Sequence, residues 1–397
     1  MNLLLLATKA PWPPVDGGRL LLLHTLEALT GAGAGLTLVA PVEPARFDLA
    51  EVAAALAPWC EPHLVAAGPA PVPAALLRSA LTNTPLSIAR HALPAVRRET
   101  ARLLATRRFD AVHVEQLQAL EQAEPAREHG VPVVLRAQNV ESDLWREVAG
   151  RSTGIRGKAL GWEARRLARW EGKCTRRVAV TLALSEEDAA RLRELGGAGA
   201  EGRIQVVRAP LPSGEGALAP PLPGDPAVVV LGSRGWLPNE DSHAWLLQEI
   251  WPAVRSALPE AVLHLYGAGL DPGAPPSGVA AHSSLEDSAQ AFAEGSVLLV
   301  PLRIASGVRM KILEAWARGV PVVATPTALA GLEAKDGRDA LVAADPAGFA
   351  RALKRLKDEP GLAASLVEGG RRSLAERHDP AKVARDLLAI YESVAVS

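Results

Sequence analysis

The sequence predicts an α/β protein built from two doubly wound parallel sheets, one in each half of the chain. Its short apolar runs are continuous rather than alternating with polar residues, which is typical of parallel strands covered on both faces. Longer amphipathic segments separate these runs, as expected for right-handed strand–helix–strand crossovers. The chain has 397 residues, of which 48% are hydrophobic. That length suits two Rossmann-like domains facing each other across a cleft.

The expected elements divide the chain into two halves joined by a linker. The expected strands are 3–7, 36–40, 111–114, 131–135, 228–231, 261–265, 297–300 and 320–324. The clearest helical patterns are 19–29, 95–104, 242–258 and 309–318. Segment 209–226 is so rich in Pro and Gly that it predicts a linker without regular structure. The sequence therefore predicts an N-terminal domain over 1–208 and a second domain over 227–379.

Composition and missing motifs exclude several classes of function. The net charge of −1 gives no bias toward nucleic acid. Cys60 and Cys174 lie far apart, which excludes a disulfide scaffold and a four-cysteine zinc site and fits a reducing compartment. The apolar start of the chain is too short for a signal peptide, and no apolar run approaches the ~18–20 residues that cross a bilayer. The motifs of Walker loops, zinc proteases and serine hydrolases, and a metal-binding Asp-x-Asp pair, are also missing.

Three glycine-rich segments receive different interpretations. Segments 31–35 and 196–197 each follow an expected helix, so we interpret them as helix ends and tight turns rather than phosphate loops. Asp16-Gly17-Gly18 instead follows the first strand and precedes a helix. Gly17 and Gly18 would let a ligand approach backbone N–H groups there, but a plain turn explains them equally well.

The stretch from Ser306 to Glu314 is the main candidate for an anion site. It follows strand 297–300 and begins a helix, where unpaired amides carry partial positive charge. Arg309 and Lys311 add cations that the helix dipole disfavours, so we expect an anion, most naturally a diphosphate. Glu314 lies a turn further along and can accept two hydrogen bonds from a ribose diol. The alternative is a solvated helix start with a weak Lys311–Glu314 ion pair.

Polar residues also follow other expected strands. Ser233, Arg234 and Asn239 follow strand 228–231, where Arg234 could pair with a phosphate and Asn239 is a good helix N-cap. In the first half, Gln138, Asn139 and Glu141 follow strand 131–135, and His113 and Glu115 end the strand before it. We expect acceptor or catalytic contacts from these five residues, although a histidine such as His113, taken alone, is more often a satisfied core histidine.

Two long stretches, 228–251 and 301–325, together resemble the C-terminal domain of GT-B glycosyltransferases of family 4, the group 1 transferases. The closest subset is the sugar transferases of bacterial exopolysaccharide systems, and 133–145 resembles the N-terminal domain of that subset. The resemblance implies two facing domains, with the acceptor on the first and a nucleoside diphosphate sugar on the second. It implies retaining transfer of a hexose without a metal or another cofactor. It also implies that the final helix, 380–397, packs back on the N-terminal domain.

The resemblance assigns roles to particular residues. Glu314 matches the ribose-binding second Glu of the family's Glu-x7-Glu motif, and the amides around Gly307, Val308 and Met310 match the diphosphate-binding turn. The first Glu of that motif falls at Ser306, and the family's usual catalytic His falls at Gln138.

The usual Arg and Lys of the nucleotide site have no clean match either. Ser233 and Asn239 fall near their places, and Arg234, Arg309 and Lys311 are the expected substitutes. Gln138 and Ser306 leave open a catalytically impaired nucleotide-sugar-binding scaffold. A nucleotide-sugar epimerase is a further alternative, because it would use the same architecture with acid/base residues in the cleft.

The acceptor is expected to be a sugar, a lipid-linked molecule or another small molecule, and nucleic acid is not an expected partner. The basic segments 97–108 and 165–177 could face anionic lipid, although solvated helix faces explain them equally well. The expected location is the cytoplasm, and peripheral association with the inner face of the membrane is left open as an alternative.

Overall fold

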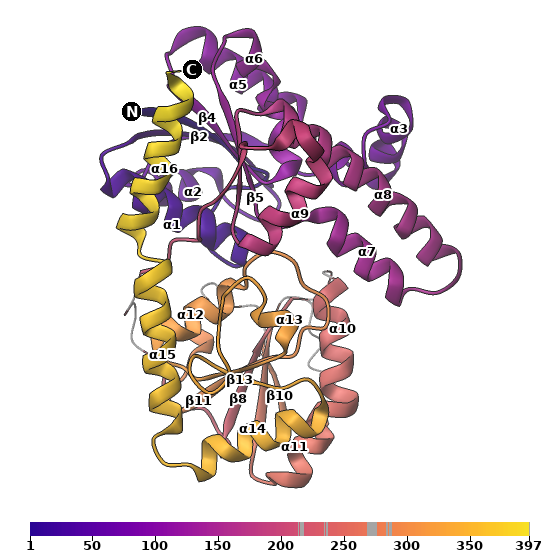
Figure 1. The fold of residues 1–397 in the computed structure, drawn as a ribbon, viewed down its shortest axis with the longest axis vertical. Helices are drawn as coiled ribbons and strands as arrows, with labels where there is room; N and C mark the ends of the chain where they lie inside the picture. Colours follow the sequence, from indigo (N-terminus) through magenta and orange to yellow (C-terminus); the bar gives the residue numbers. More distant parts are fainter. Residues whose placement is uncertain are drawn as a thin grey trace.

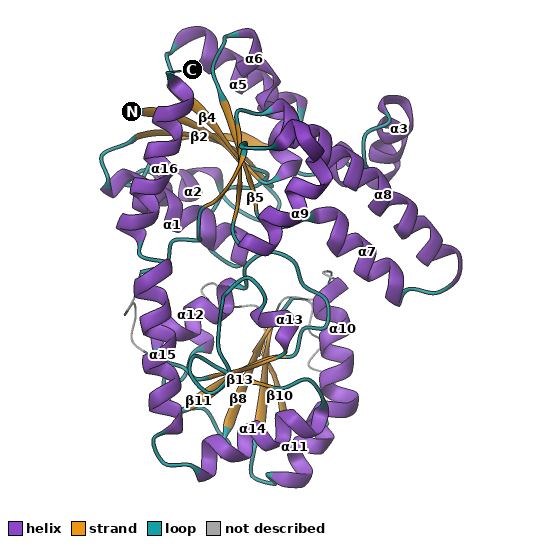
Figure 2. Cartoon of the chain, viewed as in Figure 1, coloured by secondary structure: helices purple, strands orange, loops and turns teal. Residues whose placement is uncertain are grey.

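The computed structural model of the chain describes residues 1–212, 214, 218–233, 235, 237–267, 276–282, 285 and 288–396. These residues form two α/β domains stacked along the long axis of the molecule (Figure 1). Each domain has a parallel sheet in its middle and helices on both faces, as Figure 2 shows by secondary structure. The predicted fold class, two doubly wound parallel sheets, is confirmed.

The N-terminal sheet has the strand order β3-β2-β1-β4-β5-β6-β7, and the C-terminal sheet has the order β10-β9-β8-β11-β12-β13. The N-terminal strands are β1 (Asn2–Leu6), β2 (Gly35–Val42), β3 (Glu61–Ala66), β4 (Ala111–Glu115), β5 (Val133–Ala137), β6 (Val180–Ala183) and β7 (Ile204–Val206). The C-terminal strands are β8 (Ala227–Leu231), β9 (Val262–Tyr266), β10 (Val279–His282), β11 (Ser296–Val300), β12 (Val322–Ala324) and β13 (Leu341–Val342).

The helices connect these strands as parallel crossovers. Those of the first half are α1 (Gly17–Gly31), α2 (Leu49–Leu56), α3 (Val72–Thr82), α4 (Leu86–His91), α5 (Pro94–Thr106), η1 (Leu117–Ala123), α6 (Glu124–Glu128), α7 (Glu141–Arg151), α8 (Gly154–Arg177), α9 (Glu186–Gly196) and η2 (Gly197–Ala200). Those of the second half are α10 (Leu237–Trp245), η3 (Leu246–Ile250), α11 (Trp251–Ala257), η4 (Ser288–Ala291), α12 (Met310–Arg318), α13 (Pro326–Leu329), α14 (Pro346–Asp358), α15 (Leu362–Arg377) and α16 (Pro380–Ala395).

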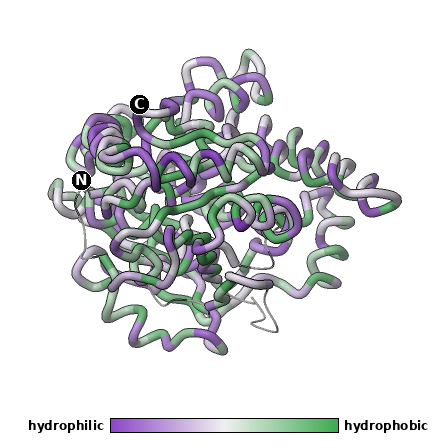
Figure 3. The backbone as a smooth tube through the Cα atoms, turned by 90° about the horizontal axis from the view of Figure 1, so that it is seen from below, coloured by the Kyte–Doolittle hydropathy of each residue, from purple (hydrophilic) through white to green (hydrophobic). Residues whose placement is uncertain are grey.

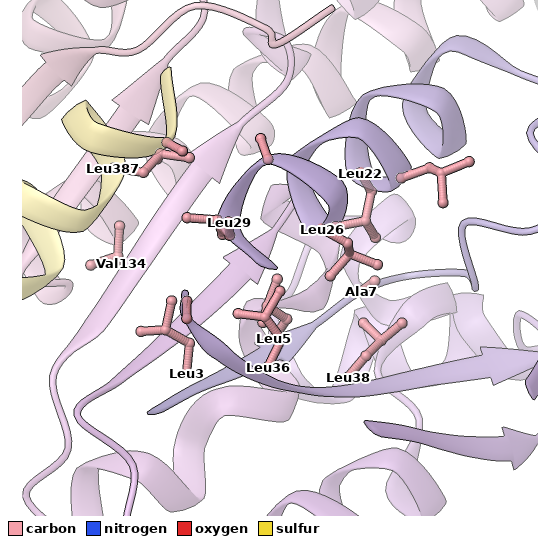
Figure 4. Close-up of a cluster of buried hydrophobic side chains, with 14 of the residues drawn as sticks. Leu3, Leu5, Ala7, Leu22, Leu26, Leu29, Leu36, Leu38, Val134 and Leu387 are labelled. Carbon is pink, nitrogen blue, oxygen red and sulfur yellow. The ribbon is translucent and has the colours of Figure 1, made fainter. Parts of the chain in front are cut away.

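The core explains why the strand sequences are continuously apolar. Leu3 and Leu5 of β1 pack beneath α1 beside Leu38 of β2 (Figure 4). Leu4 and Leu6 belong to a second cluster on the other face of the sheet. All five side chains are fully buried. Burying a leucine contributes about 1.5–3 kcal/mol, so both faces of β1 require apolar residues. In Figure 3 the hydrophobic segments accordingly gather in the interior, and the hydrophilic turns lie mainly around the periphery.

The chain returns to the N-terminal domain at its end. Helix α15 runs along the C-terminal domain, and α16 continues on the same side of the molecule to pack on α1 and β4 (Figure 1). Asp379 caps α16 by accepting a hydrogen bond from the Lys382 amide at 2.7 Å. No helix in the described part of the chain is long and apolar enough to cross a membrane.

Some expected elements differ from the observed ones. The helix expected from 242 begins at Leu237, because Pro238 fits a first helical turn. The prediction that Asn239 is an N-cap is therefore wrong, since it lies inside α10. Strand β5 runs two residues later than expected and ends directly before Gln138. The glycine interpretation is confirmed, because α1 ends at Gly31 and α9 at Gly196.

Candidate active site

The loop after β11 and the start of α12 form the centre of the candidate site. Arg309 is the N-cap residue of α12 but makes no side-chain capping hydrogen bond. The first amides of this helix are therefore not satisfied by a side-chain cap, and they carry the partial positive charge of a helix start. Buried Met310, Ile312 and Leu313 fix the helix on its core. Gly319 ends it in a left-handed conformation with φ of 79°, which turns the chain into β12.

The turn before α12 contacts the N-terminal domain directly. Gly307 has φ of 72°, and a Cβ atom there would lie 2.1 Å from the carbonyl oxygen of Gln138. The hydroxyl of Ser306 accepts a hydrogen bond from the Val140 amide at 2.9 Å. In the orientation that satisfies its neighbours, the Asn139 amide donates to the carbonyl oxygen of Ser306 at 2.9 Å. The turn of the second domain and the loop after β5 thus face each other in contact.

The glycine turn after β1 lies against the same place. A Cβ atom on Gly17 would lie 3.3 Å from the Cβ of Met310, so the two helix starts, α1 and α12, are neighbours. The Asp16 carboxylate accepts hydrogen bonds from the amides of Gly18 and Arg19, both at 3.1 Å. These two amides are therefore already occupied, and the turn is a capped helix start.

Lys311 points to the end of the neighbouring strand. Its ammonium group donates to the carbonyl oxygen of Leu231, the last residue of β8. Burial, together with the Arg309 charge, lowers the pKa of Lys311 to about 8, against the opposing effect of the Glu314 charge. A nearby anion would stabilise the charged form of this lysine and raise its pKa again, so the position favours an anionic ligand.

Arg309 points in another direction. Its Nε donates to the carbonyl oxygen of Ala328 at 2.8 Å, and one terminal nitrogen has no hydrogen-bond partner among the described residues. The side chain is only 6% exposed. Burial lowers its pKa to about 10, against the charges of Asp188 and Glu187 on α9. The two cations predicted to act together therefore point in different directions from the first turn of α12.

Glu314 lines a pocket between the domains. Its Oε1 accepts a hydrogen bond from the Ser288 hydroxyl at 2.6 Å. The pocket has a volume of about 180 Å³ and is bounded by Trp12, Leu20, Leu211 and Arg318 as well as Glu314. Small-molecule sites typically occupy ~300–1,000 Å³, so this pocket must widen before it holds a whole nucleotide sugar. Val308 is half-buried and packs against the core cluster that contains Met310, Ile312 and Leu313.

The predicted residues of the first domain form a buried hydrogen-bond network. The Glu115 carboxylate accepts from Arg136 Nε at 3.0 and 2.9 Å, from Gln138 Nε2 at 2.7 Å, and lies 3.1 Å from His113 Nε2. Burial alone would raise the pKa of Glu115, but the Arg136 charge and the hydrogen bonds from His113 and Arg136 lower it to about 2. Gln138 also accepts from Gln116 Nε2 at 2.7 Å. Its amide is therefore fixed by two partners.

The network continues to the last helix. The Tyr391 hydroxyl of α16 lies 2.8 Å from Nδ1 of His113, which is fully buried. Burial lowers the pKa of His113 and raises that of Tyr391, so the histidine is neutral and the tyrosine protonated at neutral pH. His113 is thus a satisfied core histidine that positions Glu115. Sequence reasoning named His113, Glu115 and Gln138 but missed Arg136 and Tyr391, because nothing in their local sequence marks them.

The remaining predicted residues lie around this centre. Asn239 Nδ2 donates to the Ser233 carbonyl oxygen at 2.9 Å, so these two residues lie together beyond the end of β8. Arg234 lies outside the described residues. Glu141 opens α7, its amide donates to Glu171 Oε1 at 2.7 Å, and burial raises the pKa of its own carboxyl group.

Two parallel-sheet domains that meet at the carboxyl ends of their strands form the GT-B architecture. Residues 21–210 match the sequence model of glycosyltransferase family 4, and residues 225–359 match that of the glycosyl transferases group 1. The chain therefore belongs to the family 4, group 1 glycosyltransferases, and it is a glycosyltransferase of the GT-B fold. The resemblance inferred from the sequence is confirmed.

Solved structures agree with this fold over the whole chain. Sucrose-phosphate synthase from Thermosynechococcus elongatus is 15% identical, with 100% of both chains covered and a TM-score of 0.71. Anabaena HepE in complex with UDP-glucose is 14% identical, with 98% of this chain and 99% of that chain covered and a TM-score of 0.64. A glycosyltransferase from Rickettsia africae is 12% identical, with 99% and 98% covered and a TM-score of 0.60. At these identities the likeness shows the fold alone, and no curated protein gives a significant match.

Proposed function

We propose that this glycosyltransferase moves a hexose from a nucleoside diphosphate sugar to an acceptor hydroxyl with retention of configuration, and that it uses no metal or other cofactor. One observation carries the proposal. An uncapped helix start and a partly buried lysine of depressed pKa lie where the loops of both domains meet. The partial positive charge of the helix start and the lysine together favour a dianionic group bound between the two domains.

The donor is held mainly by the second domain in this proposal. The amides of Gly307, Val308 and Met310, with Lys311, bind the diphosphate, and Glu314 binds the ribose from its place in the pocket wall. Ser233 and Asn239, which lie together after β8, approach the nucleotide from the other side. UDP-glucose is the first donor to test, because Anabaena HepE was solved with it.

The chemical step separates charge. The bond between the anomeric carbon and the diphosphate oxygen breaks, and the acceptor oxygen bonds to the same carbon on the face from which the diphosphate leaves. The proton of the acceptor hydroxyl passes to the departing diphosphate oxygen. Negative charge develops on the leaving diphosphate, next to the α12 amides and Lys311. Preorganised donors of this kind typically contribute ~2.7–4 kcal/mol each to transition-state stabilisation. Arg309 has one terminal nitrogen without a hydrogen-bond partner among the described residues, and it becomes a second donor if its side chain turns from Ala328 toward the diphosphate.

A catalytically impaired binding protein is the second candidate. Gln138 stands where the family's histidine is expected, and both ends of its amide are already bonded to Gln116 and Glu115. Such a side chain cannot accept a proton. This candidate predicts donor binding without transfer or hydrolysis. We assign Gln138 a positioning role in the first candidate, with Asn139 and Glu141 on the acceptor side.

The experiment is a thermal-shift screen of UDP-, GDP-, ADP- and TDP-sugars, followed by NMR of the product formed with simple sugar acceptors. We expect one donor to stabilise the chain, and the new glycosidic bond to have the donor's anomeric configuration, with and without EDTA. Inverted configuration or loss of turnover with EDTA contradicts the mechanism, and binding without turnover favours the impaired protein.

A matched pair of variants tests the donor site. Glu314→Ala should weaken donor binding about tenfold or more by calorimetry, because a buried carboxylate that holds two hydroxyls is lost. Glu368→Ala removes an exposed glutamate of α15 and should leave the affinity unchanged. Equal affinities for the two variants would remove Glu314 from the site.

We further propose that the acceptor is a sugar, alone or lipid-linked, and that the protein works in the cytoplasm or at the inner face of the membrane. The basic segment 97–108 supports membrane contact poorly, since Arg102 and Arg107 pair with Glu99 and Glu61. The other basic segment, 165–177, lies on α8, where Arg165, Arg169 and Lys173 form no salt bridge with a described carboxylate.

A further inference from the structure

Helices α3 and α8 form an outward surface that combines exposed apolar residues with exposed basic residues. Both helices project from the N-terminal sheet at one margin of the molecule (Figure 1). Six of the nine large hydrophobic side chains exposed in the described part of the chain lie on them: Val72, Leu76, Leu77, Leu81, Ile155 and Trp162. Leu77 is 64% exposed and Leu81 is 78% exposed. Scattered exposed leucines are ordinary, but a gathering of this kind marks an interaction surface.

Buried polar contacts hold the two helices together, so their relative positions are fixed by the fold. Arg166 of α8 donates to the Ser79 hydroxyl at 3.0 Å and to the Thr84 carbonyl oxygen at 2.8 Å, and it pairs with Glu163 at 2.8 Å. Its guanidinium group stacks 4.4 Å from the ring centre of Trp162. These contacts fix α3 on α8 and place Trp162 beside α3.

The charge on this surface has one sign. Along α8, Ile155, Lys158, Trp162, Arg165, Arg169 and Lys173 recur at three- and four-residue spacing and therefore share one face. Both acidic residues of α8, Glu163 and Glu171, are buried, and α3 has none. Within the described chain, the salt bridges that α8 makes to carboxylates involve Arg166 and Arg177, not the basic residues of this face.

We propose that the α3–α8 surface docks on a membrane that contains anionic lipid. An apolar face of leucines flanked by tryptophan and exposed cations matches the boundary between acyl chains and acidic headgroups. Anionic lipid also adds attraction for each Lys or Arg near the surface, whereas a protein partner would have to supply a complementary acidic apolar face.

The surface is linked to the candidate site by the fold. Helix α3 follows the carboxyl end of β3, at the edge of the sheet that faces the second domain. Glu171 of α8 accepts the amide hydrogen bonds of Glu141 and Ser142, directly after the Gln138–Val140 loop that meets Ser306. A membrane under α3 and α8 would therefore present a lipid-linked acceptor to the first domain. This direction of delivery rests on the proposed function, but the docking itself does not.

The test is co-sedimentation of the full chain with vesicles of phosphatidylcholine alone or mixed with phosphatidylglycerol. We expect binding to the mixed vesicles and weak binding to phosphatidylcholine, with loss at high salt because surface charges are screened. The variants L76S/L77S/L81S and R165Q/R169Q/K173Q should each lower the partition coefficient about tenfold or more. R351Q/K354Q/R372Q makes the same change of net charge on α14 and α15 and should bind like the wild type.

Three results would overturn the proposal: no vesicle binding by the wild type, equal loss in the α14–α15 control, or unchanged binding by both α3–α8 variants. A change of oligomeric state by L76S/L77S/L81S in sedimentation velocity, with vesicle binding unchanged, would assign the surface to a second copy of the chain. Donor binding, measured by thermal shift on the same samples, separates the two proposals. Vesicle binding without donor binding refutes the proposed function and leaves the docking surface standing.

Discussion

Lys311 is a residue of the candidate site whose charge changes close to neutral pH. Its pKa in the free protein is about 8, because burial disfavours the ammonium form. Above that pH the free protein loses the proton, whereas a bound diphosphate favours the charged form and raises the pKa. Donor affinity should therefore fall as the pH rises through about 8, and binding in this range should take up a proton.

Calorimetry over a pH series, in two buffers of different ionisation enthalpy, measures both quantities. Lys311→Arg is the matched control, since a guanidinium group stays charged throughout and should remove the proton uptake. The same proton uptake by wild type and Lys311→Arg would show that another group titrates.

Gly307 is required by the close contact between the domains. Its φ of 72° disfavours any side chain, and a Cβ atom would lie 2.1 Å from the Gln138 carbonyl oxygen. Gly337 has a similar φ of 71° but nothing within 4 Å of that position. Gly337→Ala should cost about 1 kcal/mol of unfolding free energy for its conformation alone.

Gly307→Ala should do more than Gly337→Ala, because the Gln138 loop must move away. We expect a loss of about 2 kcal/mol or more in urea unfolding, or a more open arrangement of the domains in small-angle scattering. Identical effects of the two substitutions would mean that the loop yields freely and that the contact is not tight.

At the level of elements, α16 joins the buried network of the first domain. The Tyr391 hydroxyl is bonded to His113, and His113 in turn lies against Glu115. Tyr391→Phe leaves a buried ring nitrogen of His113 without its partner, which should cost about 1–2 kcal/mol in equilibrium unfolding. Glu392→Gln, an exposed change on the same helix, should have no measurable effect.

If the network positions Gln138 for catalysis, Tyr391→Phe should also lower kcat with little change in KM for the donor. A change confined to stability would make the network structural alone.

The elements show how far the sequence could predict the structure. Long apolar runs such as Leu3–Leu6, buried on both faces, were identifiable because every position is constrained. Strand β3 was missed because its sequence contains Glu61 and His63 and it is only partly buried. Strand β13 was missed because it has two residues. Pattern reasoning detects strands through runs of buried apolar residues, so a half-exposed strand such as β3 leaves only a weak signal.

The candidate site was predictable to a similar degree. Gly307, Lys311 and Glu314 could be named because a helix start with cations has a local signature. The direction of each side chain had no such signature. Arg309 turns toward α13 and α9, and Asp16 caps the glycine turn of α1. Partners distant in sequence, such as Tyr391 for His113, are set by the three-dimensional fold alone.

At the scale of the whole molecule, the two domains are in contact at the place where the donor should bind. Ser306 and Gly307 touch the loop after β5, Gly17 lies against Met310, and the pocket at Glu314 is smaller than a nucleotide sugar needs. We therefore interpret this arrangement as closed, with donor entry requiring a small separation of the domains. Leu144, Val148 and Ile304 form a small apolar cluster across the interface that such a separation would expose.

The account depends most on the positive charge at the start of α12, and turnover with the identified donor tests it directly. Lys311→Ala and Lys354→Ala each remove one lysine, the first from the proposed diphosphate site and the second from the exposed surface of α14. We predict that kcat falls about 100- to 1,000-fold in Lys311→Ala, with unfolding unchanged, and stays at the wild-type value in Lys354→Ala. Wild-type turnover by a folded Lys311→Ala protein would contradict the account.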